Sequence, residues 1–178
     1  MKVMILSDSH FLNKHDLLEI LHQQKCNYYI HCGDIYMPFE GLGMTSFYNV
    51  RGNNDGHQIP IELNLEIDHL NFYVTHGHLY DVDFTLDNLL DYAKDNNKDV
   101  VLFGHTHRPT YEIIDDIIFI NPGSLSFPRG KYRKPTYAIF DTQSKNVTFY
   151  DASTGEMCDP FTKENKEKKG SFFSRLFK

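Results

Sequence analysis

Acidic, amide and imidazole side chains occur in short clusters along this sequence, each directly after an apolar run. Ten histidines stand in a chain of 178 residues. The candidates for chemistry are Asp8, His10, Asp34, Asn53, His76, His105 and His107. Carboxylates and imidazoles with one amide oxygen suit Mn²⁺, Fe or Zn²⁺ better than Mg²⁺ or Ca²⁺. Seven donors exceed the needs of one ion, so the set favours two ions that share a carboxylate.

Two cations about 4 Å apart suit a particular kind of chemistry, the cleavage of phosphoesters. They neutralise the charge of the phosphate and acidify a bound water, which is otherwise a poor nucleophile at neutral pH. Each cluster by itself is more typical of a turn or a helix cap. Their joint occurrence, in this order and each after an expected strand, favours a metal centre.

The elements that must position these residues follow from hydrophobic periodicity. Strands are expected over 2–6, 28–30, 47–50, 61–67, 70–74 and 100–103, helices over 13–24 and around Leu86 to Ala93, and hairpins turning near 115–116 and 143–146. Five of these strands end in a candidate cluster. Since the carboxyl ends of strands converge on the ligand crevice of α/β sheets, the clusters are predicted to meet.

Local geometry is expected to help in two ways. In an extended chain, residues i and i+2 share a face, so Asp8 and His10 should point the same way, as should His105 and His107. Glycines accompany the candidates, and they let the backbone approach a crowded centre; they are Gly33, Gly52, Gly77 and Gly104.

Composition favours one cytoplasmic domain. Hydrophobic residues make up 40% and charged residues 24%, without an apolar run long enough to span a bilayer. The odd count of three cysteines argues against a disulfide framework, and the net charge of −6 disfavours a nucleic-acid partner. Residues 161–178 are expected to form a basic, flexible tail beyond a domain over 1–160. An alternative role for that tail is contact with an anionic membrane surface.

The ordered motifs resemble the calcineurin-like metallophosphoesterase superfamily. Its pattern of D-x-H, G-D, G-N-x-[DE], a histidine after a strand, and G-H-x-H stands here at residues 8–10, 33–34, 52–55, 75–78 and 104–107. The small size, the HGH triplet and the NPGS segment at 121–124 are most similar to compact YfcE-type phosphodiesterases. The resemblance covers residues 1 to about 150 and implies a four-layer αββα sandwich, an α/β (α+β) fold of two mixed sheets flanked by helices.

The resemblance also implies how the ligands divide. One ion would take Asp8, His10, Asp34 and His107, and the other Asp34, Asn53, His76 and His105. Asp34 would bridge the two ions together with a hydroxide that attacks phosphorus in line. Mn²⁺ is the expected metal, with Zn²⁺, Fe or Ni²⁺ as alternatives.

The sequence departs from the superfamily at Asn54, where many members have a histidine that helps the leaving group depart. Asn54 can donate a hydrogen bond to substrate but cannot transfer a proton. His78 is the candidate replacement, with His57 a weaker one. Asp55 is expected to orient a ligand or a loop backbone, and Arg129 to pair with the substrate phosphate.

Three functions stay open at this point. The leading one is a phosphodiesterase acting on a small phosphoester. The second is a phosphomonoesterase acting on a phosphorylated metabolite or nucleotide. The third is a protein-binding scaffold resembling the retromer subunit of this fold, which the intact set of ligands disfavours. The compact relatives suggest a homodimer or homotetramer.

Overall fold

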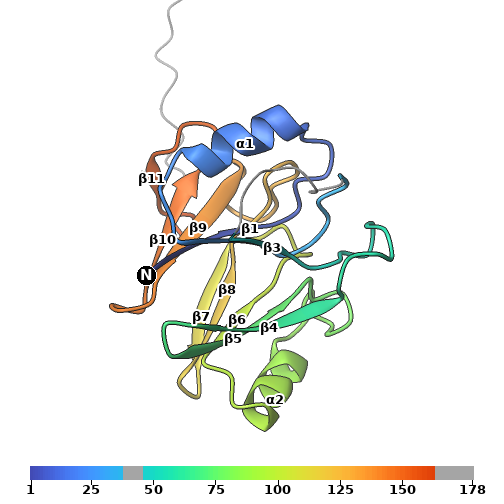
Figure 1. Ribbon diagram of the computed structural model, residues 1–178, viewed down its shortest axis with the longest axis vertical. Coiled ribbons are helices and arrows are strands. Elements are labelled where there is room, and N and C mark those ends of the chain that lie inside the picture. The colour runs from blue at the N-terminus through green and yellow to red at the C-terminus, as the bar shows by residue number, and fades with distance from the viewer. Residues whose placement is uncertain (38–45, 163–178) are drawn as a thin grey trace, which may run out of the picture.

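The structure is a computed structural model, and it describes residues 1–37 and 46–162. Two β-sheets lie face to face, with one helix on the outer side of each (Figure 1). These are the four layers that the resemblance implied, so the fold prediction is confirmed. Most of the expected C-terminal tail lies outside the described residues, and the boundary at residue 160 stays a prediction.

The first sheet has six strands in the order β11-β10-β9-β1-β2-β3. Their bounds are β1 Lys2–Leu6, β2 Tyr28–His31, β3 Phe47–Asn49, β9 Thr136–Asp141, β10 Asn146–Asp151 and β11 Met157–Cys158. β1, β2 and β3 run parallel, and β9 pairs antiparallel with β1. The carboxyl ends of the first three strands therefore reach the same edge of the sheet.

The second sheet has five strands in the order β4-β5-β6-β8-β7. Their bounds are β4 Glu62–Ile67, β5 Leu70–Thr75, β6 Val100–Leu102, β7 Thr110–Ile114 and β8 Ile117–Asn121. β5, β6 and β8 are parallel, while β4 and β7 close the two sides as antiparallel partners. The expected turn of the β7–β8 hairpin is confirmed, since Asp115 and Asp116 both have the positive φ that tight hairpin turns require.

Each helix covers one sheet. α1 (Lys14–His22) starts at Asn13, whose side chain accepts a hydrogen bond from the Asp16 backbone N–H at 3.0 Å. This is the capping interaction that favours Asn before a first turn. α2 (Asp87–Asp95) buries Leu89 and Ala93 against the second sheet. Neither of these helices, within the part of the chain that the structure describes, is long and apolar enough to cross a membrane.

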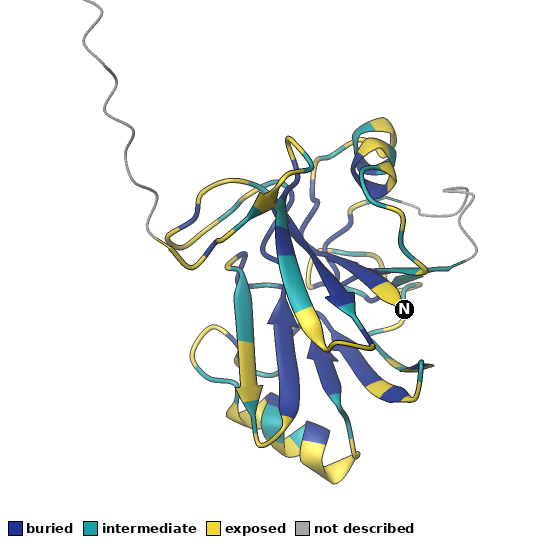
Figure 2. Cartoon of the chain, turned by 90° about the vertical axis from the view of Figure 1, so that its left-hand side faces the viewer, coloured by how far each residue is buried: buried dark blue, intermediate teal, exposed yellow. Residues whose placement is uncertain are grey.

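The alternation of side chains along the strands produces three apolar layers. In β1, Val3 and Ile5 face the second sheet, whereas Met4 and Leu6 face α1. In β8, Ile118 and Ile120 join the layer between the sheets, and Phe119 packs toward α2. Figure 2 shows the resulting buried strands in the middle of the molecule. Strands buried on both faces explain why the expected segments are nearly continuous apolar runs.

Removing one aromatic ring between the sheets tests this packing. Phe72 of β5 is fully buried and meets Phe140 of β9 edge to face, with ring centroids 5.8 Å apart. We expect Phe72→Ala to lower the free energy of unfolding by about 3–5 kcal/mol. Phe84→Ala is the matched control, because Phe84 is 91% exposed and should cost less than about 0.5 kcal/mol. Urea denaturation measures both, and equal losses would contradict this account of the core.

Candidate metal centre

The predicted ligands meet at one end of the sandwich, in the loops that follow five parallel strands. Loops after β1, β2 and β3 come from the first sheet, and loops after β5 and β6 from the second. Backbone hydrogen bonds join the first two loops, from Asp8 N to Gly33 O and from His10 N to Asp34 O, each 3.0 Å. The predicted convergence of the clusters is therefore confirmed.

The way these loops turn differs from the expectation. β1 ends at Leu6, so Asp8 and His10 lie beyond the strand and do not use its pleat. Both have left-handed backbones, with φ of 52° and 40°, and His105 and His107 follow the same pattern at 67° and 58°. Alternate left-handed residues, rather than an extended chain, bring each pair toward the centre. Asp, Asn and His tolerate this conformation better than most residues, and strained backbones concentrate at functional sites.

Close approach of the loops requires glycine at Gly52 and Gly104. A Cβ atom at Gly52 would overlap both Oδ1 and the backbone N of Asp34, and one at Gly104 would overlap the Ser7 hydroxyl. The expected role of these two glycines is confirmed. The loop after β3 can therefore lie directly against the carboxylate after β2.

A cluster of five buried side chains forms the centre. Asp8 Oδ1 lies 3.1 Å from His107 Nε2, 3.8 Å from His10 Nε2 and 3.9 Å from His76 Nε2. Asp34 Oδ2 lies 3.6 Å from His76 Nε2 and 3.9 Å from His10 Nε2. Two carboxylates thus stand among three imidazoles that point their Nε2 atoms inward.

The cluster fits cations. Asp8, His10 and His107 form one group of potential ligands, and Asp8, Asp34 and His76 form a second; within each group the donor atoms lie within 4.8 Å of one another. Asp8 Oδ1 and His76 Nε2 are buried without a hydrogen-bond partner among the described residues. Leaving such atoms unsatisfied is costly, and a bound cation removes that cost.

Backbone carbonyls hold the outer nitrogens of two of the histidines. His76 Nδ1 lies 2.6 Å from Cys32 O, and His107 Nδ1 lies 2.8 Å from Phe127 O. Each Nδ1 therefore donates its proton outward, which leaves the Nε2 lone pair for the centre. Outer hydrogen bonds of this kind orient metal-binding histidines in proteins.

His105 and Asn53 form the more exposed rim of the cluster. His105 Nδ1 lies 3.1 Å from Asn53 Oδ1, and the His105 ring stands edge-on to that of His76 with centroids 5.2 Å apart. Two donors bound to one cation at about 2.1 Å and near a right angle lie roughly 3 Å apart. The pair therefore has the spacing of two ligands of one ion.

Electrostatics keeps both carboxylates ionised. Burial raises the pKa of Asp8, but the nearby imidazoles of His107 and His76 outweigh burial, and the pKa falls below its ordinary value. The pKa of Asp34 is also raised by burial and lowered more strongly by His76 and by hydrogen bonds from Asn54. The same carboxylates raise the pKa of His76 against the opposing effect of its burial. Ionised carboxylates are the form that binds metal.

Asp55 supports the loops around Asp34. Its carboxylate accepts hydrogen bonds from the backbone N–H groups of Gly52 at 2.8 Å, Asp34 at 2.7 Å and Tyr36 at 2.9 Å. These contacts are all with backbone groups of the loops that follow β2 and β3.

The NPGS segment performs a similar task at two other loops. Ser124 Oγ donates to Asp8 O at 2.9 Å, and Asn121 Nδ2 donates to Gly104 O at 2.7 Å. The segment thus ties the loop after β1 to the loop after β6.

The residues expected to contact substrate lie in different surroundings. Asn54 is turned onto Asp34, donating from its side chain to Oδ2 at 2.7 Å and from its backbone to Oδ1 at 2.9 Å. His78 packs beside His76, with centroids 5.4 Å apart, and its pKa is lowered by burial and by neighbouring histidines. Arg129 is exposed, and its backbone N donates to His107 O at 2.9 Å. His57 lies away from these contacts, 2.9 Å from Arg51 Nη1.

Two residues near the centre were not singled out from the sequence. His31 is fully buried, and its Nε2 lies 3.1 Å from Ser9 Oγ. Asp83, in the loop before α2, lies 3.2 Å from His105 Nε2. Neither belongs to a motif, and no spacing in the sequence pairs Asp83 with a residue more than twenty positions away.

Comparison with protein families matches residues 1–145 to the calcineurin-like phosphoesterase superfamily domain. The chain belongs to this superfamily. It is therefore a metal-dependent phosphoester hydrolase, as the motifs and their resemblance predicted. The matched region of this calcineurin-like phosphoesterase contains all the predicted metal ligands. It extends to the turn between β9 and β10.

Known relatives of the phosphoesterase are similar over most of their length. Probable metallophosphoesterase YsnB of Bacillus subtilis is 34% identical in an alignment of 163 positions, which covers 89% of this chain and 96% of YsnB. Phosphodiesterase MJ0936 of Methanocaldococcus jannaschii is 33% identical, covering 82% of this chain and 95% of its own. The crystal structure of a predicted phosphoesterase from Streptococcus pneumoniae TIGR4 superposes with a TM-score of 0.78 at 28% identity, over 85% and 90% of the two chains.

A methyl group at Gly52 should disturb the centre. Because its Cβ would overlap Asp34, we expect Gly52→Ala to cost about 1–3 kcal/mol of unfolding free energy and to weaken metal binding. Gly56→Ala is the control in the same loop, where a Cβ meets open space. Urea denaturation and metal titration check both variants. A Gly52→Ala protein as stable as Gly56→Ala would refute the close approach.

Buried His31 should make stability fall in acid. Burial lowers its pKa to about 4, whereas the unfolded value is about 6.5. Between about pH 6.5 and pH 4 the unfolded chain therefore binds a proton at this histidine that the native state does not bind. Roughly 3 kcal/mol of stability is lost over this window as the pH falls. We expect His31→Gln to flatten the profile over this window, measured by urea denaturation of metal-free protein. Exposed His15→Gln is the control, and equal slopes for both variants would contradict the assignment.

Proposed function

We propose that the protein is a phosphodiesterase that uses two divalent cations to cleave a small phosphoester. The observation that carries the proposal is the pair of ligand groups joined at Asp8, with inward-facing Asp8 Oδ1 and His76 Nε2 left without partners among the described residues. A second support is the rim pair of His105 and Asn53, whose donor atoms are 3.1 Å apart. The name of the relative MJ0936 favours a diester substrate.

In this proposal the seven predicted ligands divide as the resemblance implied. Asp8, His10, Asp34 and His107 would hold one ion, and Asp34, Asn53, His76 and His105 the other. Asp34 suits the shared position because its Oδ2 faces both His10 and His76, at 3.9 and 3.6 Å. Asp8 Oδ1 also faces His10 and His76, and in addition His107. In the proposed division Asp8 binds only the ion that His10 and His107 hold.

When bound, two such cations neutralise phosphate charge and lower the pKa of water, so that hydroxide is available for in-line attack at neutral pH. The residues around them keep the donors fixed. Cys32 O and Phe127 O hold the outer nitrogens of His76 and His107. Asn54 donates two hydrogen bonds to Asp34, which keeps that carboxylate ionised and oriented.

Mn²⁺ is the proposed metal. The donor set of carboxylates, imidazoles and one amide suits Mn²⁺, Fe, Ni²⁺ or Zn²⁺, and thiolates, which softer metals prefer, do not join the ligand groups found in the described residues. Since Zn²⁺ binds most nitrogen and oxygen sites more tightly than Mn²⁺, the working metal is defined by activity after metal exchange.

Protonation of the leaving group separates the diesterase from a phosphomonoesterase. The Asn54 amide cannot transfer a proton to a leaving group, and its side chain donates a hydrogen bond to Asp34. His78 is the remaining candidate acid, but burial and the neighbouring His76 lower its pKa, so the neutral imidazole dominates at pH 7. A centre without an effective acid favours esters whose leaving groups depart readily. A phosphomonoesterase acting on a phosphorylated metabolite or nucleotide is therefore the second candidate.

Arg129 is proposed to contact the substrate phosphate. Its backbone N–H donates to the carbonyl of the predicted ligand His107 at 2.9 Å. A guanidinium matches the geometry of a phosphate group, which supports this role. A scaffold role, the alternative from another class, has less support because all seven predicted ligands are intact.

The proposed setting is the cytoplasm, which the three free cysteines support since a reducing compartment keeps thiols unpaired. A homodimer or homotetramer is proposed on the resemblance to compact relatives.

Activity after metal exchange tests the function. We expect metal-free protein to be inactive, and Mn²⁺ to restore hydrolysis of bis-p-nitrophenyl phosphate faster than that of p-nitrophenyl phosphate. Asp34→Asn removes the charge of a proposed ligand. Loss of a residue that only supports a ligand lowers activity roughly 10- to 100-fold, so we expect diester turnover to fall by at least that much. Absorbance of released p-nitrophenolate measures both reactions.

Asp116→Asn is the matched control, because Asp116 lies in the β7–β8 turn and has a positive φ that Asn also adopts. It should keep full turnover. Faster monoester hydrolysis would favour the phosphomonoesterase and make His78 the next residue to replace. Metal binding without turnover of either ester would refute the proposed diesterase and favour the scaffold.

A further inference from the structure

His105 is oriented differently from the other predicted histidine ligands. His76 and His107 present Nε2 to the centre and Nδ1 to a backbone carbonyl. His105 instead presents Nδ1 to the metal rim, 3.1 Å from Asn53 Oδ1, and turns Nε2 outward. Its outer partner is a side chain, the carboxylate of Asp83, with Oδ2 at 3.2 Å.

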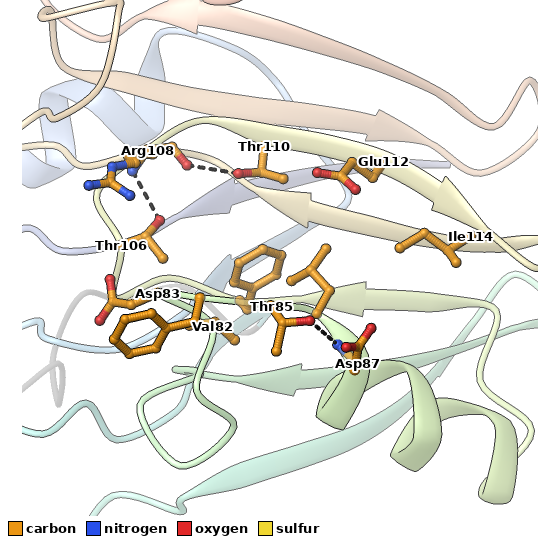
Figure 3. Close-up of a pocket in the computed structure, with 12 residues that line it drawn as sticks. Val82, Asp83, Thr85, Asp87, Thr106, Arg108, Thr110, Glu112 and Ile114 are labelled. Carbon is orange, nitrogen blue, oxygen red and sulfur yellow. Dashed lines mark hydrogen bonds between the residues drawn. The ribbon is translucent and has the colours of Figure 1, made fainter.

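Asp83 and His105 lie in two different loops of the second sheet. It lies in the loop between β5 and α2, whereas His105 lies in the loop after β6. Figure 3 shows Asp83 at the end of a pocket of about 390 Å³ that also carries Thr106 and Arg108, the residues that follow in the His105 loop. Asp87 lies at the opposite end of the same pocket, beside Thr85.

We infer that Asp83 is a positioning residue for the predicted metal ligand His105. The inference rests on the proposed two-cation centre. With Nε2 facing the Asp83 carboxylate at 3.2 Å, the lone pair of Nδ1 is directed at the position that Asn53 Oδ1 also faces. Asp83 thus selects the tautomer and the ring angle that His105 needs as a ligand.

The physical effect of such a contact is established in other metalloproteins. A carboxylate on the outer nitrogen of a ligand histidine fixes the ring and increases its basicity. His105 needs this more than His76, because the side chain of His105 is 27% exposed, against 0% for His76. A buried histidine is held by packing, whereas His105 has Asp83 and Asn53 as the polar partners of its ring within the described chain.

Asp83 can be replaced without disturbing the core. Its side chain is 45% exposed. Among the described residues, the polar partner of its carboxylate is His105. Loss of folding therefore does not complicate a substitution here. Effects of Asp83 variants on metal binding can be assigned to His105.

Calorimetric titration of metal-free protein with Mn²⁺, and separately with Zn²⁺, tests the inference. We expect two binding events in the unmodified protein. Asp83→Ala should weaken one of them about 10- to 100-fold and leave the other unchanged, and Asp83→Asn, which keeps an acceptor oxygen, should have a smaller effect. Asp87→Asn removes a carboxylate from the same pocket and should change neither event. The thermal stability of all three metal-free variants should match that of the unmodified protein.

A double-mutant cycle assigns the effect to His105. If Asp83 acts through His105, adding Asp83→Ala to a His105→Ala protein should cause no further loss of affinity. Unchanged metal affinity in Asp83→Ala, or a further loss in the double variant, would overturn the inference. Absence of a second binding event in the unmodified protein would instead overturn the proposed two-cation centre itself.

Discussion

The burial of two ionised carboxylates beside one another is the constraint on which this structure depends. Asp8 and Asp34 are almost entirely removed from water, and transfer of a charge into a protein interior is costly unless it is compensated. Three imidazoles surround them and supply partial compensation. The inward atoms that still lack hydrogen bonds mark where positive charge is required. A metal centre is thus the arrangement that makes these buried groups stable together.

Most of the surrounding structure holds the two carboxylates and the three imidazoles close together and away from water. Parallel strands in both sheets bring their carboxyl ends to one place, and the apolar layer between the sheets fixes the distance between them. Left-handed residues then turn the ligands inward over a very short path. Asp55 and Ser124 tie the loops to one another, so the strain of these turns is offset by hydrogen bonds within the same region.

The rim of the centre is organised differently from its floor. Buried His76 and His107 are held by carbonyl groups of the main chain, which cannot move independently of the fold. His105 and Asn53 are more exposed, and the polar contacts of the His105 ring are with the side chains of Asn53 and Asp83. This division leaves the more exposed candidate ligands on the surface side of the centre.

The sequence by itself determined the layers and the identity of the ligand clusters. Apolar runs such as residues 2–6 and 100–103 carry enough periodicity to define strands, and the chemistry of Asp, Asn and His in ordered motifs narrows the class of reaction. Only the tertiary structure decided how the ligands turn inward, which loops support them, and that Asp83 contacts His105. Those features depend on backbone angles and on contacts between segments distant in the chain. Local sequence patterns do not specify these contacts, because the contacts form only when the strands pack and bring the loops together.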